Sequence, residues 1–162
     1  MKQIIDNFEE EPFKFMSNFF YSPYRHNDTC FNYVENGFQS EKNPEKLRNL
    51  LSVYPVDEKG NPLTPLGPGK AKREGRRCKL FSKAEWDAKK DAVMLEHVRL
   101  KFQHNPDLAK KLIATGDALL VEGNTWHDNY WGDCHCEECK NIPGRNQLGK
   151  ILMFVREELM KK

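Results

Sequence analysis

The spacing of apolar and polar side chains along the chain predicts a mainly helical protein. In the segment SKAEWDAKKDAVMLEHVRLKF, Leu95, Val98 and Phe102 repeat at helical spacing and form one apolar stripe. Ser82 precedes this stripe, and a glutamate stands three residues after Ser82, a pattern typical of the N-terminal cap of a helix. We therefore expect a helix from about residue 83 to 103.

Two further helices and a few short extended segments follow from the same kind of pattern. The C-terminal segment GRNQLGKILMFVREELMKK places five apolar residues on one helical face. Asn105 followed by Pro106 marks the start of another helix, which should end before Gly116. Residues 118–123, ALLVEG, predict a short buried strand or turn, and the aromatic-rich residues 8–24 predict short extended segments. The expected class is mainly α with a few short β segments.

The segment YVENGFQSEK combines an apolar and a polar helical stripe. Val34 and Phe38 fall on one face, whereas Glu35, Gln39 and Lys42 share another at spacings of four and seven. A polar stripe of this kind can line a pocket, or it can be a solvated face with an ion pair. Spacing alone favours the solvated face.

The region near residues 43–70 is rich in proline and glycine, so we expect an exposed loop insertion there. It is followed by KAKREGRRCK, in which six Lys or Arg residues surround Gly75. A basic run of this composition could hold phosphate, although a solvated turn is the default interpretation.

Composition narrows the class of protein. The chain has 162 residues, of which 38% are apolar and 31% charged, and we expect one compact domain over residues 1–162. The net charge of +2 excludes a whole-protein field that attracts nucleic acid or membranes. Acidic residues near the N-terminus stand where a signal peptide has its apolar core, and no stretch approaches the roughly 20 apolar residues of a membrane span. A cytoplasmic protein is expected.

Five cysteines are an odd number, which favours thiols or thiolate ligands over a disulfide framework. Three of them lie in a cysteine-rich loop near residues 134–143. Cys134, Cys136 and Cys139 have the residue types of a tetrahedral zinc or iron site, with His127, Cys78 or Cys30 as possible fourth ligands and His127 the preferred one. Only one ligand module is visible where zinc sites usually show two, so a structural zinc and a loop of reduced thiols both stay open.

Aromatic and acidic residues meet just before the cysteines. Tyr130 and Trp131 offer a flat surface beside the carboxylate of Asp133, which suits stacking on a nucleobase while the acid acts near a sugar. A packed aromatic pair followed by a Gly-Asp turn is the alternative.

Seven short motifs occur in one order along the chain. They are SNF at 17–19, YVENGFQSEK at 33–42, AKREGR at 71–76, KF at 101–102, LVE at 120–122, D-x-YWGD at 128–133 and N-x-LGKILMFVRE at 146–157. In this order and approximate spacing the chain resembles the YbiA-like, or NADAR, family over roughly residues 8–160. The resemblance implies a compact, mainly helical domain and an N-glycosidase. It implies as substrates either phosphorylated intermediates of the riboflavin pathway or ADP-ribose attached to guanine of nucleic acid.

The resemblance also implies roles for individual residues. Glu35 matches the family's acidic residue and is the implied catalytic carboxylate, although Asn36 stands where many members have histidine. We expect Glu35 to stabilise the developing cation and to activate water, with Asp133 as a second acid near the ribose. Family positions implied to line the substrate site are Asn18, Gln39, Lys42, Arg76, Glu122, Trp131 and Asn146. Arg145 precedes the last helix, where helix N-termini attract anions, so it is expected to contact phosphate.

No cofactor is required for this reaction, and any zinc in the cysteine loop would be structural. The expected partner is an ADP-ribosyl or ribosyl-phosphate substrate, free or on nucleic acid, and not a membrane. The cysteine insertion and the loop at 43–66 depart from the riboflavin-type members and favour ADP-ribosylated guanine. Two other classes stay open: a module that binds ADP-ribose or a nucleotide without hydrolysing it, and a zinc-containing protein that binds nucleic acid.

Overall fold

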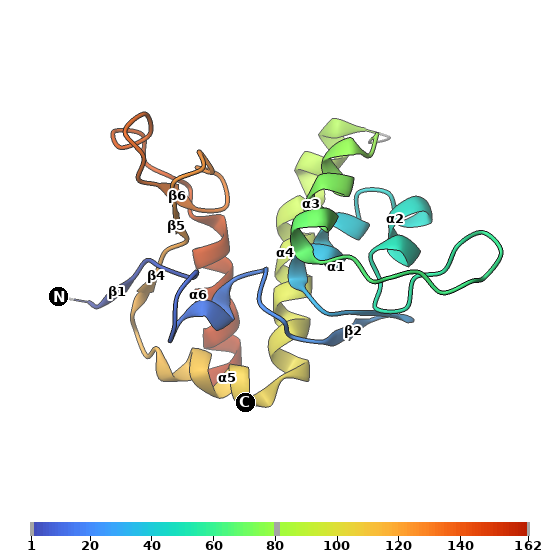
Figure 1. Cartoon of the computed structure of the whole chain (residues 1–162). Helices are drawn as coiled ribbons and strands as arrows, with labels where there is room; N and C mark the ends of the chain where they lie inside the picture. The colour runs from blue at the N-terminus through green and yellow to red at the C-terminus, as the bar shows by residue number, and fades with distance from the viewer. Residues whose placement is uncertain (1, 80–81, 162) are drawn as a thin grey trace. The chain divides into compact units, whose positions relative to one another are not determined.

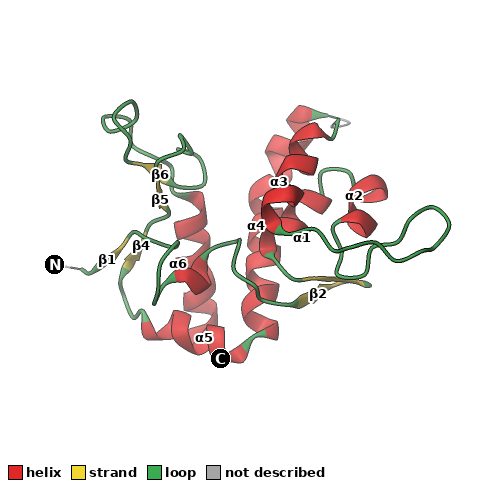
Figure 2. Ribbon diagram, in the orientation of Figure 1, coloured by secondary structure: helices red, strands yellow, loops and turns green. Residues whose placement is uncertain are grey.

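The computed structural model of the chain describes residues 2–79 and 82–161. Within them it contains six α-helices and short strands (Figures 1 and 2). The helices are α1 (Val34–Ser40), α2 (Pro44–Leu50), α3 (Pro68–Arg77), α4 (Lys83–His104), α5 (Pro106–Ala114) and α6 (Gln147–Met160), with a 3-10 turn at Lys14–Met16. The strands are β1 (Ile4–Ile5), β2 (Tyr24–His26), β3 (Thr29–Phe31), β4 (Leu119–Leu120), β5 (Gly123–Asn124) and β6 (Asp133–Cys134). The predicted mainly α class is confirmed.

The chain forms two compact units. The first unit joins the N-terminal segment up to Ser17 to the residues from Pro106 onward, and the second consists of Asn18–Asn105. The single domain predicted over residues 1–162 stays a prediction. No helix in the described parts of the chain has the length and apolar character that a membrane span needs.

The second unit is built around α1, all seven residues of which are buried. This helix packs against α2, α3 and α4 (Figure 1). Close packing on α4 requires the glycine at position 37, because a Cβ atom there would lie 2.1 Å from the Tyr24 hydroxyl oxygen and 2.5 Å from Nδ1 of His97. The predicted cap of α4 is confirmed, since the Ser82 side chain accepts a 3.2 Å hydrogen bond from the Glu85 backbone N–H.

Two expectations for the middle of the chain are wrong in part, since an exposed loop is present only between α2 and α3. The region near 43–70 is not a continuous loop, because it contains α2 and the start of α3, and the basic run expected as a turn lies largely in α3. Prolines stand in the first turn of both helices, where the missing N–H costs no hydrogen bond. Leu47, Leu51 and Ala71 pack together and bury an apolar cluster between these segments. Tertiary packing therefore makes helices out of a composition that favours turns.

In the first unit, β1 pairs with β4 in parallel, with Ile4 beside Leu119 and Ile5 beside Leu120. Helix α6 packs against α5 and β4 and buries the predicted apolar face, including Leu148, Leu152 and Val155. A second pair of short parallel strands, β5 and β6, flanks the segment that carries the aromatic residues. The cysteine-rich loop begins at the end of β6. The helix predicted to follow Asn105 is confirmed as α5.

Candidate functional site

Glu35 lies in the first turn of α1 and is only 6% exposed. The side-chain amide of Gln39, one turn later, donates a hydrogen bond of 2.7 Å from Nε2 to Oε1 of Glu35. Burial raises the pKa of Glu35 above its ordinary value, and the hydrogen bond from Gln39 opposes that rise. The shared face predicted for these two residues is confirmed, and the solvated-face interpretation is wrong because both side chains are buried.

Three cations further oppose the rise in the pKa of Glu35: Lys72, Lys42 and Arg76. Lys42 follows the end of α1, and its Nζ lies 3.5 Å from the carbonyl oxygen of Gly75 and 5.7 Å from the centre of the Trp86 ring. Burial lowers the pKa of Lys42, and the charge of Glu35 partly offsets this effect. Three cations thus lie near enough to the carboxylate for their charges to favour its ionised form, and cations of this kind can also bind phosphate.

Lys72 was not among the residues predicted from the sequence. It lies four positions before Arg76 on α3, and this spacing puts both cations on one face of the helix. The spacing was visible in AKREGR, but it has meaning only in a helix, and the run was expected as a turn. The Nζ atom of Lys72 also lies 5.8 Å from the centre of the half-exposed Phe19 ring.

The approach of α3 to α1 depends on Gly75. A Cβ atom at this position would lie 1.8 Å from Oε1 of Gln39 and 2.6 Å from its Cδ. Real side chains do not come so close, so any larger residue would displace the amide that binds Glu35. Gly75 is therefore part of the support for the carboxylate.

Asn18 borders the start of α1. Its backbone carbonyl accepts a 3.2 Å hydrogen bond from the N–H of Glu35, and its Nδ2 lies 3.4 Å from Sδ of Met94. Oδ1 of Asn18 and Oε1 of Gln39 are buried acceptors with no hydrogen-bond partner among the described residues. Buried acceptors of this kind are rare, and they are available to hydroxyl or amide donors of a ligand.

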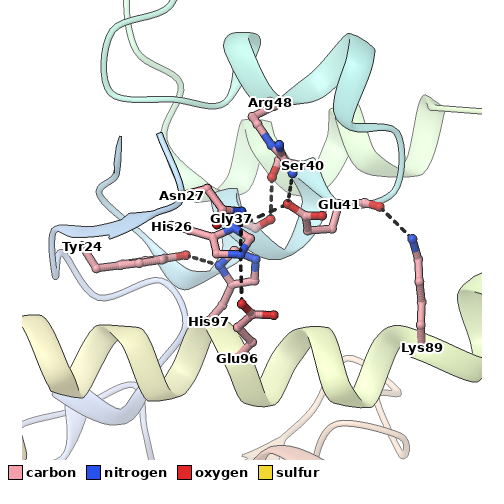
Figure 3. Close-up of polar contacts among 10 residues, drawn as sticks. All are labelled: Tyr24, His26, Asn27, Gly37, Ser40, Glu41, Arg48, Lys89, Glu96 and His97. Carbon is pink, nitrogen blue, oxygen red and sulfur yellow. Dashed lines mark hydrogen bonds and ion pairs between the residues drawn. The ribbon is translucent and has the colours of Figure 1, made fainter. Parts of the chain in front are cut away.

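The opposite side of α1 is held by a polar network, shown in Figure 3. Tyr24 and Nδ1 of His97 share a 2.8 Å hydrogen bond, and the His26 and His97 rings meet edge to face at 4.7 Å. His26, Glu41 and His97 bring one donor atom each within 4.8 Å of one another. However, Glu41 already pairs with the guanidinium of Arg48 at 2.8 Å, so we interpret this group as support for α1.

Asp133 and Trp131 lie in the first unit. Oδ1 of Asp133 accepts a 2.8 Å hydrogen bond from the backbone N–H of Gly144, and its Oδ2 lies 3.6 Å from Nε2 of His135. The half-buried Trp131 packs edge to face on Tyr130, with ring centres 5.0 Å apart. The guanidinium carbon of the exposed Arg145 lies 5.3 Å from the centre of the Tyr130 ring.

Asn146 and Glu122 form a backbone junction in the same unit. The side chain of Asn146 accepts a 3.0 Å hydrogen bond from the N–H of Glu122 and donates one of 2.8 Å to the carbonyl of Leu120. Asn146 has the left-handed value φ 50° at the N-cap of α6. The amide thus ties the β4 segment to the start of the helix, while its predicted contact with substrate stays a prediction.

The predicted substrate residues therefore form two groups. The second unit brings together Asn18, Glu35, Gln39, Lys42 and Arg76. The first unit contains Glu122, Trp131, Asp133, Arg145 and Asn146.

The four predicted metal ligands come together within the first unit. His127, Cys134, Cys136 and Cys139 each place one ligand atom within 4.8 Å of the others. All five cysteines of the chain are free thiols, so no disulfide accounts for this clustering. Burial and the neighbouring thiols raise the pKa of Cys139 to about 12.

Comparison with known proteins places these features in a family. The model of the NADAR domain matches residues 7–160. An N-glycosidase of Acanthamoeba polyphaga mimivirus is 42% identical over 95 residues, 55% of this chain and 55% of that protein. A riboflavin biosynthesis protein of Vibrio vulnificus is 32% identical over 162 residues, 99% of this chain but 40% of that protein. The chain thus spans about half the length of these curated relatives.

The fold has a solved counterpart. The NMR structure of the E. coli protein YbiA is similar with a TM-score of 0.75 and 30% sequence identity. The match covers 99% of this chain and 87% of that chain. The fold expected from the sequence resemblance is therefore confirmed.

Proposed function

The chain belongs to the NADAR domain family, and on that basis we propose that it is an N-glycosidase, a hydrolase that cleaves the bond between a ribose and a nitrogen base. The observation that carries the proposal is the environment of Glu35. A buried carboxylate with a raised pKa, hydrogen-bonded by Gln39 and surrounded by three cations, has the properties that this reaction needs. Relatives named N-glycosidases support the same reaction.

Cleavage of a ribosyl C-N bond passes through a transition state with positive charge on the sugar. The anion of Glu35 stabilises this charge, and it does so strongly because buried charges are weakly screened. The same carboxylate takes a proton from the attacking water, and a pKa raised by burial makes it a better base near neutral pH. The water oxygen bonds to the ribose carbon, while the base leaves with the electron pair of the C-N bond and takes a proton from solvent. The hydrogen bond and the cations favour the ionised form of the carboxyl.

The cations indicate a phosphorylated substrate. In this proposal Lys42, Lys72 and Arg76 bind phosphate or pyrophosphate oxygens of the substrate, while Glu35 acts at the ribose. ADP-ribose attached to guanine is our first candidate substrate. The phosphorylated ribosylamino-pyrimidine of riboflavin synthesis is the second, because the relative named a riboflavin biosynthesis protein matches 99% of this chain.

Residues of the first unit keep the roles predicted from the sequence. The sequence predicts that Asp133 orients ribose hydroxyls or assists proton transfer, that Trp131 stacks on the base and that Arg145 contacts phosphate, and these roles stay predictions. Asp133→Asn tests the first of these roles separately from Glu35.

The decisive experiment compares the wild-type protein with Glu35→Gln on both candidate substrates, with the released base and sugar followed by mass spectrometry. Glu35→Gln keeps the shape of the side chain and removes its charge, so we expect turnover to fall by at least ~100-fold. Glu45→Gln, at an exposed position of α2, is the matched control and should retain full turnover. Wild-type turnover by Glu35→Gln would contradict the mechanism.

The same samples also test the binding-module alternative. Calorimetric titration with ADP-ribose measures binding without cleavage. Wild-type protein that binds ADP-ribose but releases base from neither substrate would favour a non-catalytic module over an N-glycosidase.

A further inference from the structure

We propose that His127, Cys134, Cys136 and Cys139 form a structural zinc site that clips together the two ends of the segment bearing Trp131 and Asp133. The site lies wholly within the first unit, and it does not depend on the proposed glycosidase activity.

The distances fit a tetrahedral ion. Zinc binds thiolate sulfur at about 2.3 Å and imidazole nitrogen at about 2.0–2.1 Å, so a tetrahedral pair of these ligands is separated by about 3.5 Å. Nδ1 of His127 lies 3.3 Å from Sγ of Cys136 and 3.4 Å from Sγ of Cys139. Four soft or borderline donors at this spacing match zinc better than magnesium or calcium, which prefer oxygen ligands.

The other nitrogen of His127 faces an exposed carboxylate, at a distance beyond that of a hydrogen bond. Its Nε2 lies 3.9 Å from Oε2 of Glu138. Histidines that bind zinc through one nitrogen usually direct the other N–H to a carboxylate or carbonyl, which fixes the tautomer of the ring. Nδ1, which lies 3.3–3.4 Å from two of the sulfurs, is the nitrogen placed to act as the ligand.

Strand pairing and local hydrogen bonds hold the four ligands close together. Strands β5 and β6 pair Asn124 with Cys134, and the N–H of Cys134 donates a 2.8 Å hydrogen bond to Oδ1 of Asn129. A turn at the other end brings the N–H of Cys139 to 3.0 Å from the carbonyl oxygen of Cys136. His127 has the left-handed value φ 66°, a conformation that costs roughly 1–2 kcal/mol and that a ligand bond would stabilise.

The loop needs such a clip because it buries little apolar surface. Trp126 is 45% exposed and Ile142 is 55% exposed, so these large side chains at the two ends add little to a core. Four protein ligands leave no open position, and this favours a structural role over a catalytic one. His127 and Cys134 directly flank the segment 128–133, so a shared ion fixes the spacing of its ends.

The test measures metal in the purified chain of 162 residues. We expect about one zinc ion per chain, and X-ray absorption should report three sulfur ligands at about 2.3 Å and one nitrogen at about 2.0–2.1 Å. Cys136→Ser and Cys139→Ser should weaken zinc binding by at least ~100-fold, because a lost ligand costs more than a lost neighbour of a ligand. Cys30→Ser and Cys78→Ser, which lie outside the cluster, should retain the full zinc content.

Hydrogen exchange supplies a readout that does not depend on the variants. Removal of zinc by a chelator should speed exchange in residues 124–146 and leave α4 unchanged. Three results would overturn the proposal. The protein could remain free of zinc after reconstitution with zinc salts, or the cluster variants could contain as much zinc as the control variants. The third is a disulfide between any two of the three loop cysteines.

Discussion

Nε2 of Gln39 donates a hydrogen bond of 2.7 Å to Oε1 of Glu35, one helical turn before it in α1. This bond favours the ionised form of the carboxyl, whereas burial favours the protonated form. The protonation state of Glu35 therefore depends on neighbours that do not react themselves. Variants of those neighbours should change the pH dependence of the reaction more than they change the fold.

Gly75→Ala should displace the amide that binds Glu35. The new methyl group would meet Oε1 of Gln39 at 1.8 Å, so the side chain must move or the helices must separate. We expect the pKa of Glu35 to rise, the acidic limb of the pH profile of kcat/KM to move to higher pH, and stability to fall by about 1–3 kcal/mol. Gly69→Ala, on the same helix with nothing within 4 Å of the added Cβ, is the control.

Gly69→Ala should leave the pH profile unchanged, since it meets no other side chain. It should also stabilise the protein by up to about 1 kcal/mol, because alanine is the better helix former. Identical pH profiles for Gly75→Ala and the wild-type protein would show that Gln39 does not control Glu35.

Lys42→Met should act on both the carboxylate and the substrate. Loss of the positive charge raises the pKa of Glu35, and loss of a phosphate ligand should raise KM for a phosphorylated substrate by about tenfold. Lys42→Arg retains the charge, so its KM and the pKa of its Glu35 should lie between those of Lys42→Met and those of the wild-type protein. Lys46→Met, at an exposed position of α2, removes an equal charge and should change neither quantity. Steady-state kinetics across pH measure all four proteins.

Periodic segments of the chain were predictable because one physical signal dominates them. The apolar face of α6 and the shared face of Glu35 and Gln39 follow from helical spacing, and the structure confirms them. In α4 the predicted Val98 and Phe102 are buried, but Leu95 is only half-buried.

Helices α2 and α3 are not predictable from local composition, because they depend on a contact between segments. Leu47 of α2 and Ala71 of α3 are buried in one apolar cluster. The prolines and glycines of this region are compatible with helix starts as well as with turns, so they do not distinguish the two.

Parts of the candidate site depend on the same distinction. Lys72 escaped detection because its alignment with Arg76 exists only if α3 is helical. The burial of Glu35 was also beyond the sequence, since a polar stripe faces either water or a pocket until its neighbours are known. By contrast, the convergence of the three loop cysteines with His127 follows from residue types and close spacing, and the structure brings them together as expected.

Asn146→Ala should destabilise the junction between β4 and α6. The substitution removes the hydrogen bonds to Glu122 and Leu120 and forces alanine into a left-handed conformation. We expect the free energy of unfolding to fall by about 2–4 kcal/mol in urea titrations. Asn146→Gly tolerates the conformation and should lose less, while Asn141→Ala, at an exposed position, should be neutral. If the glycine and alanine variants lost equal free energy of unfolding, the lost hydrogen bonds would explain the whole effect and the left-handed conformation none of it.

His97 should make the folded state sensitive to acid. Burial, followed by the nearby charges of His26 and Arg48, lowers the pKa of His97 from 6.5 to about 3. Below pH 6.5 the unfolded chain binds a proton that the folded protein excludes. Stability is therefore complete above pH 6.5 and falls, by up to about 1.4 kcal/mol per pH unit, as the pH decreases toward 3.

Removal of the imidazole isolates this contribution from that of the carboxyl groups. His97→Gln should be less stable than the wild-type protein at pH 7, because it disturbs the hydrogen bond to Tyr24, but its stability should fall less steeply between pH 6.5 and 4. His104→Gln, at an exposed position of the same helix, should keep the wild-type slope. Urea titrations at half-unit steps of pH measure the three slopes, and parallel curves for His97→Gln and the wild-type protein would refute a neutral buried histidine at this position.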